Sequence, residues 1–211
     1  MVSNVESPAP ESIGEIATVR VELLDTDPLI WREVEVPTSV TLKSLHEIIQ
    51  ALMGWEDYHL WEFTTAKQRF GPPSDEDWGN PPLVDAAKTC LRDVLKPRKT
   101  SIDYLYDFGD SWELRLIVTR IRPGEPDVVY PRYIAGERNA PPEDCGGIPG
   151  FYNKLDIIAD PKNPDHDDIV EWMGEYDPET VDEKAIKARL ARVANRRKIG
   201  TRRSKKPKAS D

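Results

Sequence analysis

The sequence predicts an α+β fold: a mainly antiparallel sheet of about five strands, an early helix between strands and a C-terminal group of three helices. Two patterns lead to this fold class. Apolar and polar residues alternate in most segments before residue 140, whereas apolar residues recur at helical spacing after it. Strands that come first and helices that come last are typical of α+β folds, because α/β folds alternate the two.

Composition indicates one globular domain between two tails. The chain has 211 residues, 38% of them hydrophobic and 32% charged, which is ordinary for one soluble domain. We expect a disordered tail over 1–14, a single domain over 15–195 and a basic, disordered tail over 196–211. No apolar run approaches the ~20 residues that span a bilayer, and Met1–Pro10 lacks a basic and apolar leader. The expected location is therefore the cytoplasm, without a membrane partner.

Two strands open the domain. The alternation from Ile16 to Leu23 predicts the first strand, with a slip between Ile16 and Val19. A turn at 25–28 leads to a second strand over 29–36. The domain is thus expected to begin with a hairpin.

The clearest helix follows this hairpin. Apolar residues recur at helical spacing from Leu42 until Gly54, and a hydroxyl residue within 38–41 is expected to cap the helix. His46 lies next to the apolar face, where we interpret it as a packing residue rather than a ligand. The Pro-rich segment 66–82 is expected to be a long irregular excursion.

A second hairpin carries the most distinctive residues of the chain. Alternation over 102–106 and 112–118 predicts two strands, so the Asp-Phe-Gly-Asp-Ser segment between them must be the connection. Gly109 can take a positive φ and Asp110 can bond back to the backbone, so these residues suit a tight hairpin turn. Asp107 and Asp110 would then lie close together at the tip.

The segment Pro141–Gly147 reads Pro-Pro-Glu-Asp-Cys-Gly-Gly. Its prolines stiffen the chain and its glycines allow unusual backbone geometry, so it can hold Glu143 and Asp144 in fixed positions. Two interpretations stay open. The acids cap the following helix, whose dipole favours them, or they help to bind a divalent cation, which needs further converging ligands. The candidate metal ligands are Asp107, Asp110, Glu143, Asp144 and His166.

Three C-terminal helices are predicted around 151–158, 169–173 and 186–193. Several acids crowd the start of the middle helix, where the helix dipole favours them, so we interpret them as stabilisers. His166 beside them can change charge with pH or complete a metal site.

Other catalytic chemistry finds little support in the sequence. Cys90 and Cys145 lack the close Cys or His spacing of a zinc site. The acids beside Cys145 are expected to raise the pKa of its thiol and suppress thiolate chemistry. Phosphate loops, dinucleotide-binding motifs, nucleophile elbows and His-Glu-x-x-His motifs are also missing.

Charge is divided unevenly along the chain. Residues 196–211 contain eight basic residues and the single acid Asp211, a formal charge of +7, so a net charge of −9 leaves −16 on the rest. The acidic body repels phosphate backbones, whereas the tail can bind nucleic acid weakly and nonspecifically, or simply be a solvated terminus. The basic residues of the tail are Arg196, Arg197, Lys198, Arg202, Arg203, Lys205, Lys206 and Lys208.

Several separated motifs carry a family resemblance. They are Ile30-Trp-Arg32, Leu45-His46, Gly54-Trp55, His59-Leu60, Tyr104–Trp112, Tyr130-Pro131, Ala135–Glu137, Pro141–Gly147, Trp172 and Tyr176–Pro178. In this order, over about 16–193, they resemble the Ri-plasmid Orf-three-like family. The resemblance implies an α+β domain of unassigned biochemical role, and some members are passengers in insertion elements.

The chain departs from the family pattern in two places. Members often have Trp-x-His after the hairpin turn, where this chain has Trp112-Glu113-Leu114, and extra cysteines near the positions of Tyr133 and Asn139. A metal or redox site built from those residues in relatives would be lacking here. Some members carry a resolvase-like label, but the serines of this chain lack the activated, arginine-rich setting that a resolvase nucleophile needs.

Two functional hypotheses follow. The favoured one is a noncatalytic protein-interaction module associated with mobile elements, which uses no cofactor and receives a protein or peptide. Its expected binding residues are Tyr106, Asp107, Asp110, Trp112, Glu143 and Asp144, with Trp55, Trp112 and Tyr133 as aromatic anchors. The alternative is a hydrolase that depends on Mg²⁺ or Mn²⁺ held by the clustered carboxylates. Convergence of at least three of the five candidate metal ligands would favour the hydrolase.

Overall fold

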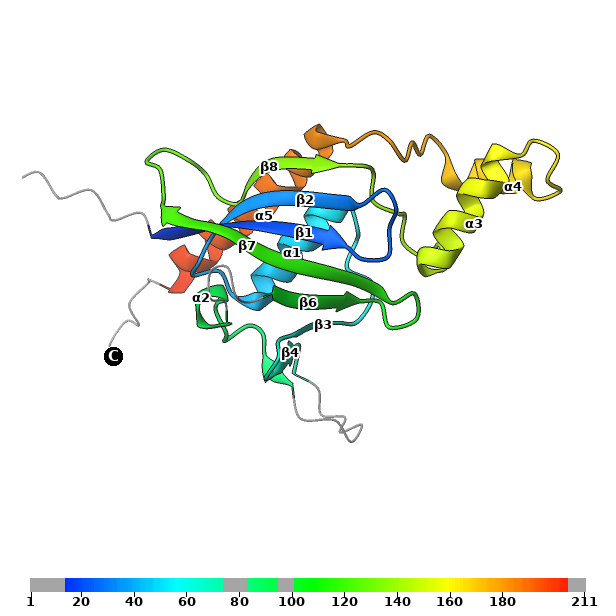
Figure 1. The fold of residues 1–211 in the computed structure, drawn as a ribbon. Coiled ribbons are helices and arrows are strands. Elements are labelled where there is room, and N and C mark those ends of the chain that lie inside the picture. Colours follow the sequence, from blue (N-terminus) through cyan, green and yellow to red (C-terminus); the bar gives the residue numbers. More distant parts are fainter. Residues whose placement is uncertain (1–13, 74–82, 95–100, 205–211) are drawn as a thin grey trace, which may run out of the picture.

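The computed structural model describes residues 14–73, 83–94 and 101–204, with side chains up to Arg196. This part of the chain forms one sheet of eight strands and five helices (Figure 1). The strands are β1 (Glu15–Leu23), β2 (Ile30–Pro37), β3 (Trp61–Thr64), β4 (Arg69–Gly71), β5 (Val84–Asp85), β6 (Ser101–Tyr106), β7 (Trp112–Pro123) and β8 (Arg132–Glu137). The helices are α1 (Leu42–Met53), α2 (Leu91–Val94), α3 (Gly147–Ala159), α4 (His166–Met173) and α5 (Glu183–Ser204).

The predicted sheet of about five mainly antiparallel strands with three C-terminal helices was wrong, although the class is α+β. The described strands follow the order β5-β4-β3-β6-β7-β1-β2-β8, and the sheet is mixed because β4 and β5 pair in parallel. The short helix α2 adds to α1 and the three later helices. Strands of two or three residues, such as β4 and β5, are too short to produce a recognisable alternation.

The opening hairpin forms as the sequence predicts. β1 pairs antiparallel with β2, and Val19, Val21 and Leu23 are fully buried. β1 also pairs with β7, and this register shifts between Thr18 and Val19. A register shift of this kind is a β-bulge, in which one extra residue moves the alternation of buried and exposed side chains by one position. The bulge explains the slip between Ile16 and Val19 in the sequence pattern.

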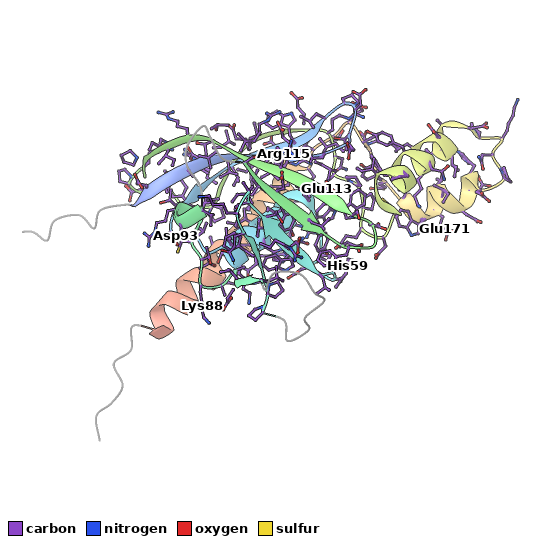
Figure 2. All side chains as sticks on the ribbon, turned by 60° about the horizontal axis from the view of Figure 1, so that its bottom comes forward. His59, Lys88, Asp93, Glu113, Arg115 and Glu171 are labelled. Atoms are coloured by element: carbon purple, nitrogen blue, oxygen red, sulfur yellow. The ribbon has the colours of Figure 1, made fainter. Side chains whose placement is uncertain are left out.

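Helix α1 supports the central strands. The Thr41 side chain accepts a hydrogen bond from the Ser44 amide at 3.1 Å, and Gly54 ends the helix with φ of 80°. α1 and α5 contact each other and lie on the same side of the sheet (Figure 1). Glu113 and Arg115 of β7 are exposed on the sheet (Figure 2).

Helices α3 and α4 pack together and project from one end of the sheet (Figure 1). α5 then continues to Ser204, so the predicted tail begins on this helix, and its disorder stays a prediction. The predicted tails over 1–13 and 205–211, and segment 74–82, lie outside the described residues. Among the described helices, none combines the length and the apolar character that a membrane crossing requires.

Candidate functional site

The hairpin turn, residues 107–111, joins β6 to β7. The two strands pair up to Tyr106 opposite Trp112, so the turn begins directly at Asp107. The Asp107 Oδ1 atom accepts a hydrogen bond from the Gly109 amide at 2.9 Å. Asp107 and Ser111 take positive φ values of 55° and 53°, whereas Gly109 does not use the positive φ that a glycine allows. Aspartate tolerates this conformation because its side chain can bond to the nearby backbone.

The Pro-Pro-Glu-Asp loop, residues 141–147, lies against the hairpin turn. The Gly146 amide donates to Asp110 Oδ2 at 3.0 Å. Gly147 has φ of 65°, and a Cβ atom at this position would lie 2.4 Å from the carbonyl oxygen of Asp110. The Trp55 indole holds the start of the loop by donating to the Pro141 carbonyl at 3.0 Å. Two segments far apart in the sequence therefore meet at one end of the sheet.

Two of the predicted acids are engaged in holding this junction. The Asp110 carboxylate accepts the Gly146 amide, as above. The Glu143 carboxylate accepts hydrogen bonds from the Tyr106 hydroxyl and, at 2.7 Å, from the Glu56 amide. Burial, together with Glu143, raises the pKa of Tyr106, so its hydroxyl remains a donor.

The other two acids of the hairpin turn and the loop face a histidine. His59 Nε2 lies 3.1 Å from Asp144 Oδ1 and 3.6 Å from Asp107 Oδ2. One ligand atom from each residue lies within 4.8 Å of the other two, and we call these residues the His59 cluster. The structure thus brings together Asp107 and Asp144 but neither Asp110, Glu143 nor His166 with them. His166 lies on α4 and pairs with Asp167 at 3.0 Å.

His59 was missed in the sequence, although its position follows from strand pairing. Trp61 of β3 lies opposite Tyr106 of β6, and the Asp107 amide donates to the Leu60 carbonyl at 2.9 Å. The residues directly before β3 therefore lie beside the hairpin turn. The β3–β6 register identifies His59 as a neighbour of the hairpin turn. The alternation of apolar and polar residues within each strand does not reveal this register.

The imidazole of His59 is held in place but is not fully satisfied. Its ring packs edge-on against Tyr106, with ring centroids 5.7 Å apart. The Nε2 atom is buried and makes no aligned hydrogen bond to the described residues. The 3.1 Å separation from Asp144 is therefore a close polar contact rather than a hydrogen bond with good angles. Figure 2 shows His59 beside the sheet and away from Glu171 of α4.

The aromatic residues expected to contact a partner are buried. Tyr106 and Trp112 are fully buried, and Trp55 and Tyr133 are nearly so. Trp55 stacks on Tyr106 at 5.1 Å between centroids and also contacts Trp112 at 5.8 Å. These rings form the interior that supports the junction. The role of Trp55, Trp112 and Tyr133 as anchors for a partner stays a prediction.

Other apolar residues are exposed beside the same junction. Tyr58 is 75% exposed, Leu60 65% and Phe108 50%. Leu60 and Phe108 lie on neighbouring segments, because the Leu60 carbonyl accepts a hydrogen bond from the amide of Asp107, which precedes Phe108. We call Tyr58, Leu60 and Phe108 the apolar rim; it flanks His59 and Asp107 in the sequence. The periodic spacing of apolar residues indicates which residues are buried and does not indicate exposed apolar residues such as these.

A buried polar network lies beneath the site. His46 Nδ1 lies 2.7 Å from the Tyr104 hydroxyl and His46 Nε2 lies 2.8 Å from Asp57 Oδ1. Gln50 completes the network: its side chain donates a hydrogen bond to the Tyr104 hydroxyl at 3.1 Å and accepts one from the Asp57 amide at 3.0 Å. Burial lowers the pKa of His46 to about 4, so the imidazole is neutral near pH 7. His46 is therefore a satisfied interior residue, as the sequence suggested.

Cys145 is buried within the loop. Burial is the main cause that raises the pKa of its thiol to about 11, and Asp110 adds to the effect. The expected rise is present, but desolvation outweighs the neighbouring acids that were expected to cause it. Among the basic residues of the C-terminal tail, Arg196 is exposed on α5, and the side chains of the others lie outside the described part.

Comparison with known proteins assigns the chain to a family. Residues 15–185 match the plasmid pRiA4b ORF-3-like protein family, and the chain belongs to it. It is similar to the uncharacterized protein y4hQ of Sinorhizobium fredii, with 35% identity over 165 residues that cover 78% of this chain and 84% of that protein. It is also similar to the crystal structure of the protein of unknown function MM3350 from Methanosarcina mazei Go1. That similarity has a TM-score of 0.76 and 34% identity, and covers 82% of this chain and 98% of the other.

Proposed function

We propose that this chain is a noncatalytic protein-interaction module of the cytoplasm, with a binding surface formed by the apolar rim and the neighbouring acids. The exposed rim at a rigid junction is the observation that carries the proposal. Tyr58 and Leu60 are the most exposed large apolar residues of the described chain, and the exposed Phe108 follows Asp107, whose amide donates to the Leu60 carbonyl. Exposed apolar residues gathered at one place commonly mark a site of protein contact.

The surroundings of the rim favour a partner segment that is partly apolar and basic. The Asp144 side chain is 67% exposed, and the Asp57 side chain is 52% exposed. The nearby guanidinium of Arg189 is engaged by Glu56 at 2.7 Å. A basic partner would be attracted to the acidic body and would gain contact area from the rim.

Rigidity of the junction supports recognition rather than a mobile binding loop. The loop is fixed to the hairpin turn through Asp110 and Gly147, and Glu143 fixes it to Tyr106 at the end of β6. A surface that is ordered before binding loses less conformational entropy on association. Phe108 lies in this hairpin turn, and Leu60 is held to it because its carbonyl accepts a hydrogen bond from the Asp107 amide.

The hydrolase alternative receives less support. Two of the five predicted metal ligands, Asp107 and Asp144, converge, whereas Asp110 and Glu143 are engaged in the junction and His166 lies on α4.

The proposed cytoplasmic location fits the free thiols of Cys90 and Cys145, because the cytoplasm is reducing. The association with mobile elements stays a prediction.

Affinity capture with matched variants tests the proposal. The full chain is compared with the triple variant Tyr58→Ser, Leu60→Ser and Phe108→Ser by quantitative mass spectrometry of proteins captured from an extract of its own cells. The control carries Val129→Ser and Ile134→Ser, which remove exposed apolar residues elsewhere. We expect a specific protein to be recovered at least about tenfold less by the rim variant and fully by the control. Equal recovery by all three proteins, or no specific recovery by the full chain, would contradict the proposal.

A further inference from the structure

We propose that His59, Asp107 and Asp144 bind one divalent transition-metal ion, Zn²⁺ or Mn²⁺. This site goes beyond the interaction role, and it differs from the metal site expected from the sequence because its nitrogen ligand is His59 and not His166. Its ligands come from three segments: the connection before β3, the hairpin turn and the Pro-Pro-Glu-Asp loop.

The separations within the His59 cluster suit a shared ion. Ligand atoms that bind one metal at about 2.0–2.2 Å lie roughly 3–3.5 Å from each other. His59 Nε2 lies 3.1 Å from Asp144 Oδ1 and 3.6 Å from Asp107 Oδ2. All three atoms are within 4.8 Å of one another, so a small movement of the exposed Asp144 side chain completes the arrangement.

The state of His59 Nε2 is the second observation that points to a ligand. This atom is buried and lacks an aligned hydrogen bond to any described residue, while it faces both carboxylates. A buried polar atom without a partner is costly, and such atoms in folded proteins commonly mark a bound ion or water. A metal ion between the three side chains would accept the nitrogen lone pair.

The charges of the cluster also favour a cation. Asp107 and Asp144 bring two carboxylates close to one imidazole, and within the described part of the chain no Lys or Arg forms an ion pair with either acid. Two neighbouring negative charges without a cationic partner repel each other. A divalent ion would remove this repulsion and connect the hairpin turn to the loop.

The donor set distinguishes among metal ions. Imidazole nitrogen suits Zn²⁺ and other transition metals, carboxylate oxygen suits Mn²⁺ as well, and Mg²⁺ and Ca²⁺ prefer oxygen alone. Three protein ligands leave coordination positions open. The Asp107 side chain is 12% exposed and that of Asp144 67%, so an ion can enter from the Asp144 side and keep contact with solvent.

Binding is tested on the full chain after removal of metals with a chelator. Electron paramagnetic resonance follows the loss of the free Mn²⁺ signal, and thermal unfolding is measured with ZnCl₂, MnCl₂ or MgCl₂. We expect one Mn²⁺ per chain and a rise in Tm of roughly 5–10 °C at an ion concentration of about 100 times Kd. MgCl₂ is expected to have much less effect. Absence of saturable binding of both Zn²⁺ and Mn²⁺, or a response to Mg²⁺ alone, would overturn the proposal.

Variants locate the ion. Asp144→Asn keeps the size of an exposed side chain and is expected to weaken binding at least tenfold, as is His59→Gln. The matched controls are His166→Gln and Asp167→Asn, since this pair has the same groups 3.0 Å apart on α4; they are expected to bind like the wild type. Circular dichroism establishes whether each variant is folded. If His59→Gln does not fold, Asp144→Asn alone tests the site. Wild-type affinity in a folded Asp144→Asn variant would overturn the site.

Discussion

Single residues at this junction show how two histidines of the same chain can have different roles. His46 is buried with both ring nitrogens close to partners, Tyr104 and Asp57. His59 is buried at Nε2 without an aligned partner. The first arrangement stabilises the fold with a neutral imidazole, whereas the second leaves the Nε2 atom without a partner in the described part of the chain. Residue type alone therefore does not separate a structural histidine from a candidate ligand; its partners do.

The neutral state of His46 predicts a pH dependence of stability. Burial lowers its pKa in the folded state to about 4 from the usual 6.5, so the unfolded chain takes up the proton first as the pH falls. The contribution of neutral His46 to the free energy of unfolding is complete above pH 6.5 and falls progressively as the pH is lowered. At about pH 4 the loss amounts to about 3 kcal/mol. Urea unfolding of the wild type and of His46→Gln across this range measures the difference. Parallel stability curves for the two proteins would refute the assignment.

The exposure of individual aromatic and apolar side chains was the feature that the sequence predicted least well. Trp112 and Trp55 are aromatic and lie next to the unusual turns, so they were expected to contact a partner, yet both are buried. Tyr58, Leu60 and Phe108 look like ordinary core residues in the sequence but are exposed. Which aromatic residue is buried depends on what packs above it, and that is set by segments far away in the chain.

At the scale of elements, local patterns predicted local structure well. The strand β1 with its bulge, the helix α1 with its caps at Thr41 and Gly54, and the β6–β7 hairpin each follow from short-range signals. β4 and β5 carry no such signal because each is only two or three residues long. The candidate metal ligands expected from the sequence come from both the Pro-Pro-Glu-Asp loop and the hairpin turn, but they do not include His59 from the connection before β3.

The contact between the loop and the hairpin turn predicts that two glycines respond differently to alanine. Gly147 has positive φ and no space for a Cβ atom, which would lie 2.4 Å from the Asp110 carbonyl oxygen. Gly147→Ala should therefore lower the free energy of unfolding by about 2–4 kcal/mol. Gly109 does not take a positive φ and its nearest neighbour is the Asp107 side chain at 3.3 Å, so Gly109→Ala should cost much less.

Urea unfolding of these two variants and of the wild type provides the measurement. Gly14→Ala is a suitable control because nothing lies within 4 Å of its Cβ position. If Gly147→Ala were no less stable than Gly109→Ala, the close approach of the loop to the hairpin turn would be wrong.

At the scale of the whole molecule, the fold places the junction and the tail on different elements. The junction lies where the β6–β7 hairpin meets the start of α3, and the chain then returns along α5 toward the basic residues (Figure 1). The fold class was predictable because segments of one periodicity follow segments of the other. The number of strands was not, because sheet edges are completed by short strands that only tertiary pairing defines.

The basic tail predicts weak binding of nucleic acid that does not depend on sequence. The full chain should bind a random DNA duplex at low salt, and the triple substitution Lys205→Gln, Lys206→Gln and Lys208→Gln should make the slope of log K against log salt shallower by up to about 3. Fluorescence anisotropy at several salt concentrations measures the slope. An unchanged slope would assign the binding to another surface.

X-ray diffraction from crystals grown with Mn²⁺ tests most directly the claim that the hairpin turn, the Pro-Pro-Glu-Asp loop and the connection before β3 form one site. We expect an anomalous peak about 2.2 Å from His59 Nε2 and from one carboxylate oxygen each of Asp107 and Asp144, with the Gly146 amide still bonded to Asp110. A peak found only elsewhere, or a loop separated from the hairpin turn, would contradict it.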